Sequence, residues 1–169
     1  ATLALPAAAQ TYTKTDTHTY EDNLDLWVLG QPKATTNVNT GLVENSVDYD
    51  PATALPIRTY KFGKLQQTLV YYGGGNLKSV SDARDTSSFN TTITFSSWKR
   101  GLPQRIDYPD TTYKLLSVDD YGLITWVEDE NRFRTCYAFD AMGRLSGITY
   151  PSKTTAGACD ASWNKLVRT

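Results

Sequence analysis

Three observations predict an all-β protein built from tandem antiparallel β-hairpins. The 169 residues include 11 Tyr and 4 Trp beside many threonines, a composition that suits pleated, half-buried surfaces. Residues 11–20 alternate with a period of two, as a strand does. Glycines recur every 21 residues in the second half of the chain. Apolar residues at helical spacing are hard to find, so we expect little helix.

The first expected strand covers Thr11–Tyr20, "TYTKTDTHTY", in which threonine occupies every odd position. His18 is the only histidine and shares the other face with Lys14 and Asp16. Because no second histidine or cysteine lies near it in the sequence, we interpret it as a solvated strand residue. A metal site or a catalytic triad would need such partners.

Two prolines mark the next segment, Asp48–Pro56, as a loop. Asp48 and Asp50 are candidate calcium ligands, but carboxylates beside proline more often cap turns, and we expect the turn. Further on, three consecutive glycines begin at Gly73 and separate an aromatic strand end from a new strand. A phosphate-binding loop would need a Lys-Ser/Thr pair and a following helix, so we expect a hairpin here as well.

The second half of the chain carries an internal repeat. Gly101, Gly122 and Gly143 are 21 residues apart, and each is preceded by an apolar residue and followed by leucine and a β-branched residue. The apolar residues are Phe95, Leu116 and Tyr137, the leucines are Leu102, Leu123 and Leu145, and the β-branched residues are Ile106, Val127 and Ile148. Agreement in several columns at once indicates a repeat.

Each repeat unit has the chemistry of a tight turn. The segments 119–122 and 140–143 begin with Asp119 and Asp140 and end with Gly122 and Gly143. An aspartate at the first position can accept a backbone N–H two residues later, and glycine at the fourth can adopt a left-handed backbone. We therefore expect β-hairpins whose apolar faces are buried by stacked neighbours.

The stretch "YAFDAMGRLSGITYP" resembles the tyrosine-aspartate (YD) repeat of Rhs-type proteins. That signature is an aromatic residue, an aromatic-Asp pair, two variable residues and Gly-Arg-Leu; here these are Tyr137, Phe139-Asp140, Ala141-Met142 and Gly143-Arg144-Leu145. A weaker copy keeps Asp119, Gly122 and Leu123, and another keeps Gly101 and Leu102 with Trp98 in place of the aspartate. The resemblance covers most of Leu26–Pro151. We therefore divide the chain into an N-terminal strand segment (1–25), YD-type hairpin repeats (26–151), and a loop with the start of a further repeat (152–169).

The resemblance implies a curved sheet that is part of a larger hollow β-shell. In bacterial Rhs and Tc toxin complexes such a shell encloses a toxic C-terminal segment, and related shells occur in teneurins. The family's chemistry is self-cleavage by an aspartate-bearing core module, whose Asp-Pro-x-Gly core is not found in this sequence. The implied function is a non-catalytic shell segment that encapsulates or presents a polymorphic toxin or surface domain. Its implied partners are neighbouring repeats, the core module and the enclosed toxin, in a secreted or cell-surface bacterial protein.

Two alternatives compete with this interpretation. The tryptophans could be exposed platforms for sugars, which would make the chain a carbohydrate-binding or adhesion module; they are Trp27, Trp98, Trp126 and Trp163. An enzyme could use Asp119 with Asp120, or Asp129 with Glu130, as an acid/base pair. Because adjacent carboxylates on a strand point to opposite faces, we expect no enzyme.

Charge and cysteine content limit the remaining classes. Lys plus Arg total 17 against 18 for Asp plus Glu, which argues against a nucleic-acid partner. No apolar run approaches the roughly 20 residues of a membrane helix. The opening "ATLALPAAAQ" is either a signal-peptide remnant or, as we favour, an artificial boundary or a cut inside a longer protein. Cys136 and Cys159 could form a disulfide or remain free, and we expect no metal or other cofactor.

Hairpins cut from a larger array would leave unpaired strand edges, so we also expect self-association.

Overall fold

The computed structural model of the chain describes residues 13–160, 162 and 165–167. Every regular element in this part of the chain is a β-strand that pairs antiparallel with its neighbours in sequence, which confirms the predicted all-β hairpin fold. The chain divides into two compact units, residues 1–66 and 67–169. Trp163 lies outside the described residues.

The first unit contains four complete strands in chain order, which are β1 (Asp16–Asn23), β2 (Val28–Asn37), β3 (Leu42–Tyr49) and β4 (Pro56–Lys61). Each strand pairs antiparallel with the next one. Register shifts interrupt all three ladders, for example between Thr19 and Tyr20 on β1. Such bulges bend a strand and increase its twist.

The predicted strand over residues 11–20 is displaced toward the C-terminus. The observed β1 begins at Asp16 because its partner β2 ends at Asn37, directly opposite Asp16. Residues 11 and 12 lie outside the described part. His18 stands on β1 opposite Thr35, exposed, with its Nδ1 3.1 Å from the Thr35 hydroxyl.

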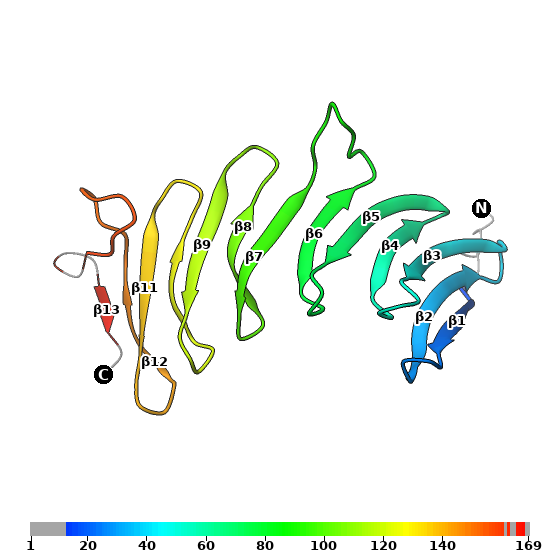
Figure 1. Cartoon of the computed structure of the whole chain (residues 1–169), viewed down its shortest axis with the longest axis horizontal. Helices are drawn as coiled ribbons and strands as arrows, with labels where there is room; N and C mark the ends of the chain where they lie inside the picture. Colours follow the sequence, from blue (N-terminus) through cyan, green and yellow to red (C-terminus); the bar gives the residue numbers. More distant parts are fainter. Residues whose placement is uncertain (1–12, 161, 163–164, 168–169) are drawn as a thin grey trace, which may run out of the picture. The chain divides into compact units, whose positions relative to one another are not determined.

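The second unit begins within β5 and continues as hairpins that lie side by side in chain order (Figure 1). Its strands are β5 (Lys64–Tyr71), β6 (Leu77–Asp82), β7 (Ile93–Lys99), β8 (Leu102–Asp107), β9 (Tyr113–Val118), β10 (Ile124–Glu128), β11 (Arg134–Phe139), β12 (Leu145–Thr149) and β13 (Lys165–Val167). Most connections are tight turns. Two are longer, one between β6 and β7 and one between β12 and β13.

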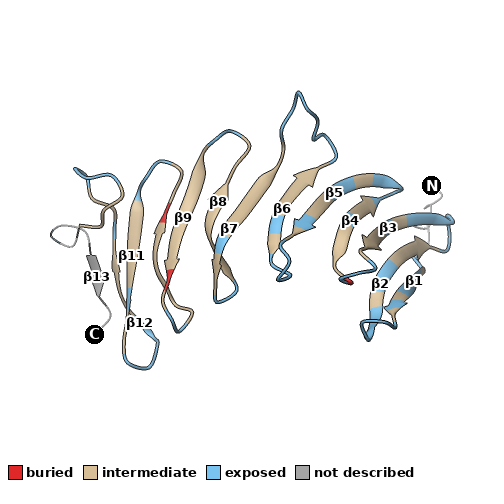
Figure 2. Cartoon of the chain, in the orientation of Figure 1, coloured by how far each residue is buried: buried red, intermediate tan, exposed pale blue. Residues whose placement is uncertain are grey.

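Few side chains of the described residues are fully buried (Figure 2). Ala54 and Val118 are the buried apolar residues, and Glu128 is the buried charged one. Most strand residues are half-buried, because within each unit the described strands pair edge to edge in one sheet and no helix packs on them. Stable domains usually bury a sheet face against another layer. The described chain also contains no helix long and apolar enough to cross a membrane.

Candidate functional site

The turn between β11 and β12 is organised by the carboxylate of Asp140. Its Oδ1 accepts the backbone N–H of Met142 at 2.9 Å and that of Arg144 at 3.0 Å. Its Oδ2 accepts the Nε–H of Arg144 at 2.8 Å. The backbone N–H of Arg144, followed by its guanidinium, lowers the pKa of Asp140 below the ordinary value. Gly143 supplies the left-handed residue at φ 75°.

The turn between β9 and β10 has the same geometry without the arginine. Asp119 Oδ1 accepts the N–H groups of Tyr121 and Leu123, both at 2.9 Å, and Gly122 has φ 90°. In each turn the aspartate donates its backbone N–H to the carbonyl of the residue four positions later. Its own backbone carbonyl accepts the N–H of the glycine three positions later. This is a three-residue hairpin loop, a type I turn followed by a left-handed bulge residue.

A third aspartate turn, between β10 and β11, is not apparent as a repeat in the sequence. Asp129 Oδ1 accepts the N–H groups of Asn131 and Phe133 at 2.9 and 2.8 Å. The left-handed position is held by Arg132, at φ 68°, instead of glycine. The signal that could have located this turn is its spacing, because Asp129 lies about midway between Asp119 and Asp140.

These turns explain the 21-residue period. Each stretch of 21 residues contains two hairpin turns, and consecutive turns lie at opposite ends of the strands. The turns of Asp119 and Asp140 are separated by one other turn, so both lie at the same end of the strands. A Cβ built on Gly143 would lie 3.9 Å from Leu123, so successive turns at one end contact each other. Leu145, at the start of β12, pairs with Phe139 and is partly exposed.

Gly101 belongs to another turn type. Lys99 pairs with Leu102, so the loop between β7 and β8 contains two residues, and both Arg100 (φ 52°) and Gly101 (φ 78°) are left-handed. This is the pattern of a type I′ turn. The 21-residue period therefore places Gly101 in register with Gly122 and Gly143 although the turn types differ, because both types require a left-handed residue at the glycine position.

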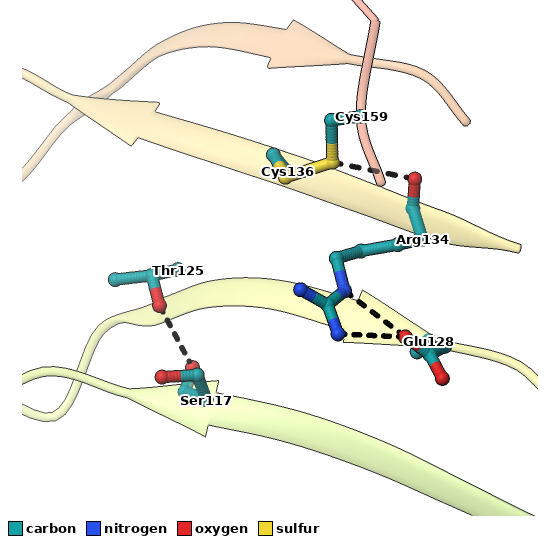
Figure 3. The surroundings of a disulfide bond; sticks show 6 residues. All are labelled: Ser117, Thr125, Glu128, Arg134, Cys136 and Cys159. Carbon is teal, nitrogen blue, oxygen red and sulfur yellow. Dashed lines mark hydrogen bonds and ion pairs between the residues drawn. A yellow bond between two sulfur atoms is a disulfide. The ribbon is translucent and has the colours of Figure 1, made fainter. Parts of the chain in front are cut away.

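An ion-pair cluster surrounds the buried side chain of Glu128, directly before the third turn, and Figure 3 shows its pair with Arg134. Glu128 is 1% exposed, and its Oε2 accepts the Nε–H and Nη2–H of Arg134 at 3.0 and 2.7 Å. Its Oε1 pairs with the Nε of Arg132. The Arg134 guanidinium also lies 3.9 Å from the centre of the Trp126 ring. Sequence reasoning missed this cluster because Glu128 precedes Asp129 and Glu130 and so resembles part of an exposed acidic turn.

The two cysteines form a disulfide that fastens the loop between β12 and β13. Cys159 is bonded to Cys136 of β11, and its Sγ lies 3.4 Å from the carbonyl oxygen of Arg134 (Figure 3). The same loop places Gly157 over the ion-pair cluster. A Cβ on Gly157 would lie 3.1 Å from Glu128 Oε2, and its N–H donates to the Arg132 carbonyl at 2.8 Å.

The described tryptophans have three different environments. Trp27 is 77% exposed at the tip of the β1–β2 hairpin. Trp98 is part-buried and donates its Nε1–H to the Leu77 carbonyl at 3.0 Å. Trp126 is half-buried under Arg134. A sugar platform built from several tryptophans, each more than half exposed, is not formed by these three residues.

The paired carboxylates that could have acted as an acid/base couple lie in turns, not on strands, and each has its own partner. Lys99 binds Asp120 at 2.9 Å and lowers its pKa, while Asp119 caps its turn. Glu130 pairs with Lys114 at 3.2 Å, while Asp129 caps the next turn.

Asp48 and Asp50 likewise serve separate partners. Tyr60 donates its hydroxyl to Asp48 at 2.8 Å, and Asp50 accepts the N–H of Ala52 at 2.9 Å and the hydroxyl of Thr53 at 3.0 Å. Asp50 is thus a turn cap, as expected, whereas the expectation is wrong for Asp48, which lies on β3 opposite Arg58. Among the described residues, no group of three or more His, Cys, Asp or Glu side chains is arranged to hold a metal ion.

Comparison with known proteins identifies the fold. No protein-family model and no curated protein sequence matches the chain. A chain in the crystal structure of TcdB2-TccC3-Cdc42 matches with a TM-score of 0.55 and 13% identity, over 85% of this chain and 9% of that chain. The crystal structure of TcdB2-TccC3-TEV gives a TM-score of 0.44 at 13% identity, over 93% and 11% of the two chains. The Photorhabdus luminescens Tc holotoxin pore gives 0.41 at 12% identity, over 79% and 9%.

The first of these matches carries the conclusion, since it has the higher TM-score and covers most of the present chain. The chain spans less than a tenth of the length of the protein it matches there. The resemblance to the Rhs and Tc toxin proteins that the YD-like stretch indicates is therefore confirmed at the level of the fold.

Proposed function

We propose that this chain is a structural wall segment of a larger Rhs/YD-type β-shell that encloses or presents a toxin or surface domain. The observation that carries the proposal is the fold shared with a chain of TcdB2-TccC3-Cdc42 over 85% of the present chain. The tandem order of the hairpins supports it, because each strand pairs with its neighbours in sequence and the array can be extended by further repeats.

The half-buried sheet faces support the same proposal. In the described chain only Ala54, Val118 and Glu128 are buried, although apolar side chains occur throughout the strands. A single-layer sheet with such faces gains stability when a neighbouring layer or an enclosed chain covers it. The partners that we propose are therefore neighbouring repeats, a core module and an enclosed segment.

The described edges of the array suggest how neighbours attach. Within the described residues, β1 pairs on one side only, with β2. An unpaired strand edge can add another strand through backbone hydrogen bonds. We propose that a further repeat occupies this edge in the complete protein, and that isolated chains associate through it.

The role that we propose is non-catalytic. The carboxylates of Asp119 and Asp140, which the YD signature singles out, are both occupied by backbone N–H groups of their own turns. The disulfide supports a secreted or cell-surface location, since disulfides persist in oxidising compartments.

The test is made on the protein encoded by the complete gene. Electron microscopy is expected to show a hollow particle, and the enclosed segment is expected to survive a protease that digests the same segment when it is expressed alone. A solid or extended particle, or a segment cleaved equally fast in both forms, would contradict the proposal.

A further inference from the structure

The tip of the β1–β2 hairpin carries an exposed apolar patch, which we define as Leu24, Leu26, Trp27 and Leu29. Leu24 is 68% exposed and Trp27 is 77% exposed. Leu26 and Leu29 are also exposed. Isolated apolar residues on a surface are ordinary, but residues 24–29 include these four exposed apolar side chains, and Val28 between them is exposed as well. Clustered exposure of this kind is typical of interaction sites.

The backbone holds Trp27 outward in an unfavourable conformation. Its φ of 58° lies in the left-handed region, which large side chains rarely adopt. Two hydrogen bonds fix the loop around it, from the Trp27 N–H to the Leu24 carbonyl at 3.3 Å and from the Leu26 N–H to Asn23 Oδ1 at 3.0 Å. Glycine would adopt this backbone conformation more easily than tryptophan. Because the indole is also largely exposed, neither the backbone nor packing within the first unit accounts for a tryptophan at this position.

The patch adjoins a hollow shared with the turn between β3 and β4. Asn23 donates to the Pro51 carbonyl at 2.8 Å, and Gln31 donates to the Ala54 carbonyl at 2.7 Å. These two bonds hold the hairpin tip against the turn. The lining of the hollow includes Glu21, Asp22, Leu24, Asp25, Tyr49 and Asp50, together with Asn23, Gln31 and Pro51 from these two bonds.

The charged side chains that line the hollow are all acidic. All charged side chains of residues 20–32 are acidic, namely Glu21, Asp22 and Asp25, and the adjoining turn adds Asp50. Glu21 is paired with Lys33, whereas Asp22 and Asp50 accept hydrogen bonds from neutral groups, the Gly30 N–H and the Ala52 N–H. The hollow therefore combines the side chains of Leu24, Tyr49 and Pro51 with four carboxylates, and among the described residues Glu21 is the one of the four that is paired with a cation.

We propose that the hairpin-tip patch and the acidic hollow dock a protein segment in which apolar residues are flanked by lysine or arginine. The apolar side chains of that segment contact Trp27 and Leu24, and its cations face Asp22, Asp25 and Asp50. Exposed tryptophans are frequent anchors of protein interfaces, and complementary charge sets the orientation and the association rate. This proposal does not rest on the shell function.

The probe is a short fluorescent peptide with two leucines between pairs of lysines, titrated with the whole chain and followed by anisotropy. Two control peptides replace lysine with glutamate or leucine with serine. We expect the lysine-leucine peptide alone to bind, with an affinity that falls as salt rises from about 50 to about 300 mM. Equal binding of the glutamate peptide, or no binding of the lysine-leucine peptide, would overturn the proposal.

The decisive variant is Trp27→Gly, which removes the indole and suits the left-handed backbone. We expect it to melt no lower than the wild type while the affinity drops by about tenfold or more. The matched control is Tyr121→Ser, which removes an aromatic residue that is 91% exposed at another acidic hairpin tip and should leave the affinity unchanged. Unchanged binding by Trp27→Gly would refute the site. Self-association of the wild type that Trp27→Gly abolishes would assign the patch to a second copy instead.

Discussion

Asp140 and Arg144 face each other across one hairpin turn, with the arginine Nε 2.8 Å from the aspartate Oδ2. The aspartate Oδ1 accepts two backbone N–H groups of the same turn. The carboxylate thus has two separable tasks, closing the turn and pairing with the arginine. Asp119 performs the first task alone, because its turn has leucine where the Asp140 turn has arginine.

Substitutions of these two aspartates separate the tasks. Asp119→Ala should lower the free energy of unfolding by about 1–2 kcal/mol, because two backbone donors lose their acceptor, whereas Asp119→Asn keeps an acceptor oxygen and should cost much less. Asp140→Ala should likewise lower Tm more than Asp140→Asn. Thermal melts compare the four variants, and equal effects of Asn and Ala at both positions would refute the turn-capping role.

Substitutions at the left-handed residues of two turns should change the stability in opposite directions. Gly143→Val should cost more than about 1 kcal/mol, because a β-branched residue is strained at φ 75°. Thr111, in the turn between β8 and β9, is already β-branched at φ 71° and is exposed. Thr111→Gly should therefore raise the stability by about 0.5–1 kcal/mol. Chemical denaturation measures both. The explanation fails if the two substitutions shift the midpoint in the same direction.

Glu128→Gln tests the ion pairs of the buried Glu128. The substitution leaves Arg132 and Arg134 without a carboxylate, and because both arginines remain partly exposed we expect a loss of about 1–3 kcal/mol. The matched control is Glu130→Gln, which removes the more exposed pair with Lys114 and should cost less than about 1 kcal/mol. Similar losses for the two variants, measured in urea, would show that the burial of Glu128 has no energetic consequence.

Loss of the disulfide should destabilise the chain by about 3 kcal/mol, the loop-closure contribution for cysteines 23 residues apart. The double variant Cys136→Ser with Cys159→Ser and the reduced wild type should agree. Limited proteolysis should then cut residues 151–159 first, because the disulfide fastens this loop to β11. A reduced protein that melts like the oxidised one would contradict this prediction.

Acid should destabilise the fold through carboxylates such as Asp140 and Asp82. The backbone and guanidinium of Arg144 lower the pKa of Asp140, and the guanidinium and backbone of Arg84 lower that of Asp82, below the ordinary 3.8. Each folded-state pKa is therefore below the unfolded one. The resulting stability is complete above about pH 5, where the unfolded carboxylates are also ionised, and is lost as the pH falls through the folded-state values. The Tm should fall between neutral pH and about pH 3, and it should fall less in Asp140→Asn with Asp82→Asn.

The hairpin turns can be predicted from the sequence where Asp is followed by Gly three residues later. Asp119 with Gly122 and Asp140 with Gly143 carry both requirements of the turn, an acceptor and a residue that tolerates positive φ. Period-two alternation and aromatic composition account for the all-β class. The bounds of β1 depend instead on where its partner strand ends, which local sequence does not determine.

Other features depend on contacts between distant residues. The turn at Asp129 is hidden because Arg132 takes the left-handed position, and it does so while bonded to Glu128 and to the hydroxyl of Tyr113. The disulfide requires the loop before β13 to fold back onto β11, over 23 residues of sequence. Neither arrangement follows from spacing or composition alone.

Because every 21 residues contain two turns, only some duplications can lengthen such a chain without disturbing the strands that follow. Copying one strand with one turn would reverse the direction of every strand that follows and would move each later turn to the other ends of the strands. Copying a strand pair with both turns preserves the direction and brings the new turn against the preceding one, as Gly143 lies against Leu123. The smallest duplication that leaves the downstream chain correctly oriented is therefore the strand pair, so a gene of this type is expected to lengthen in steps of about two strands.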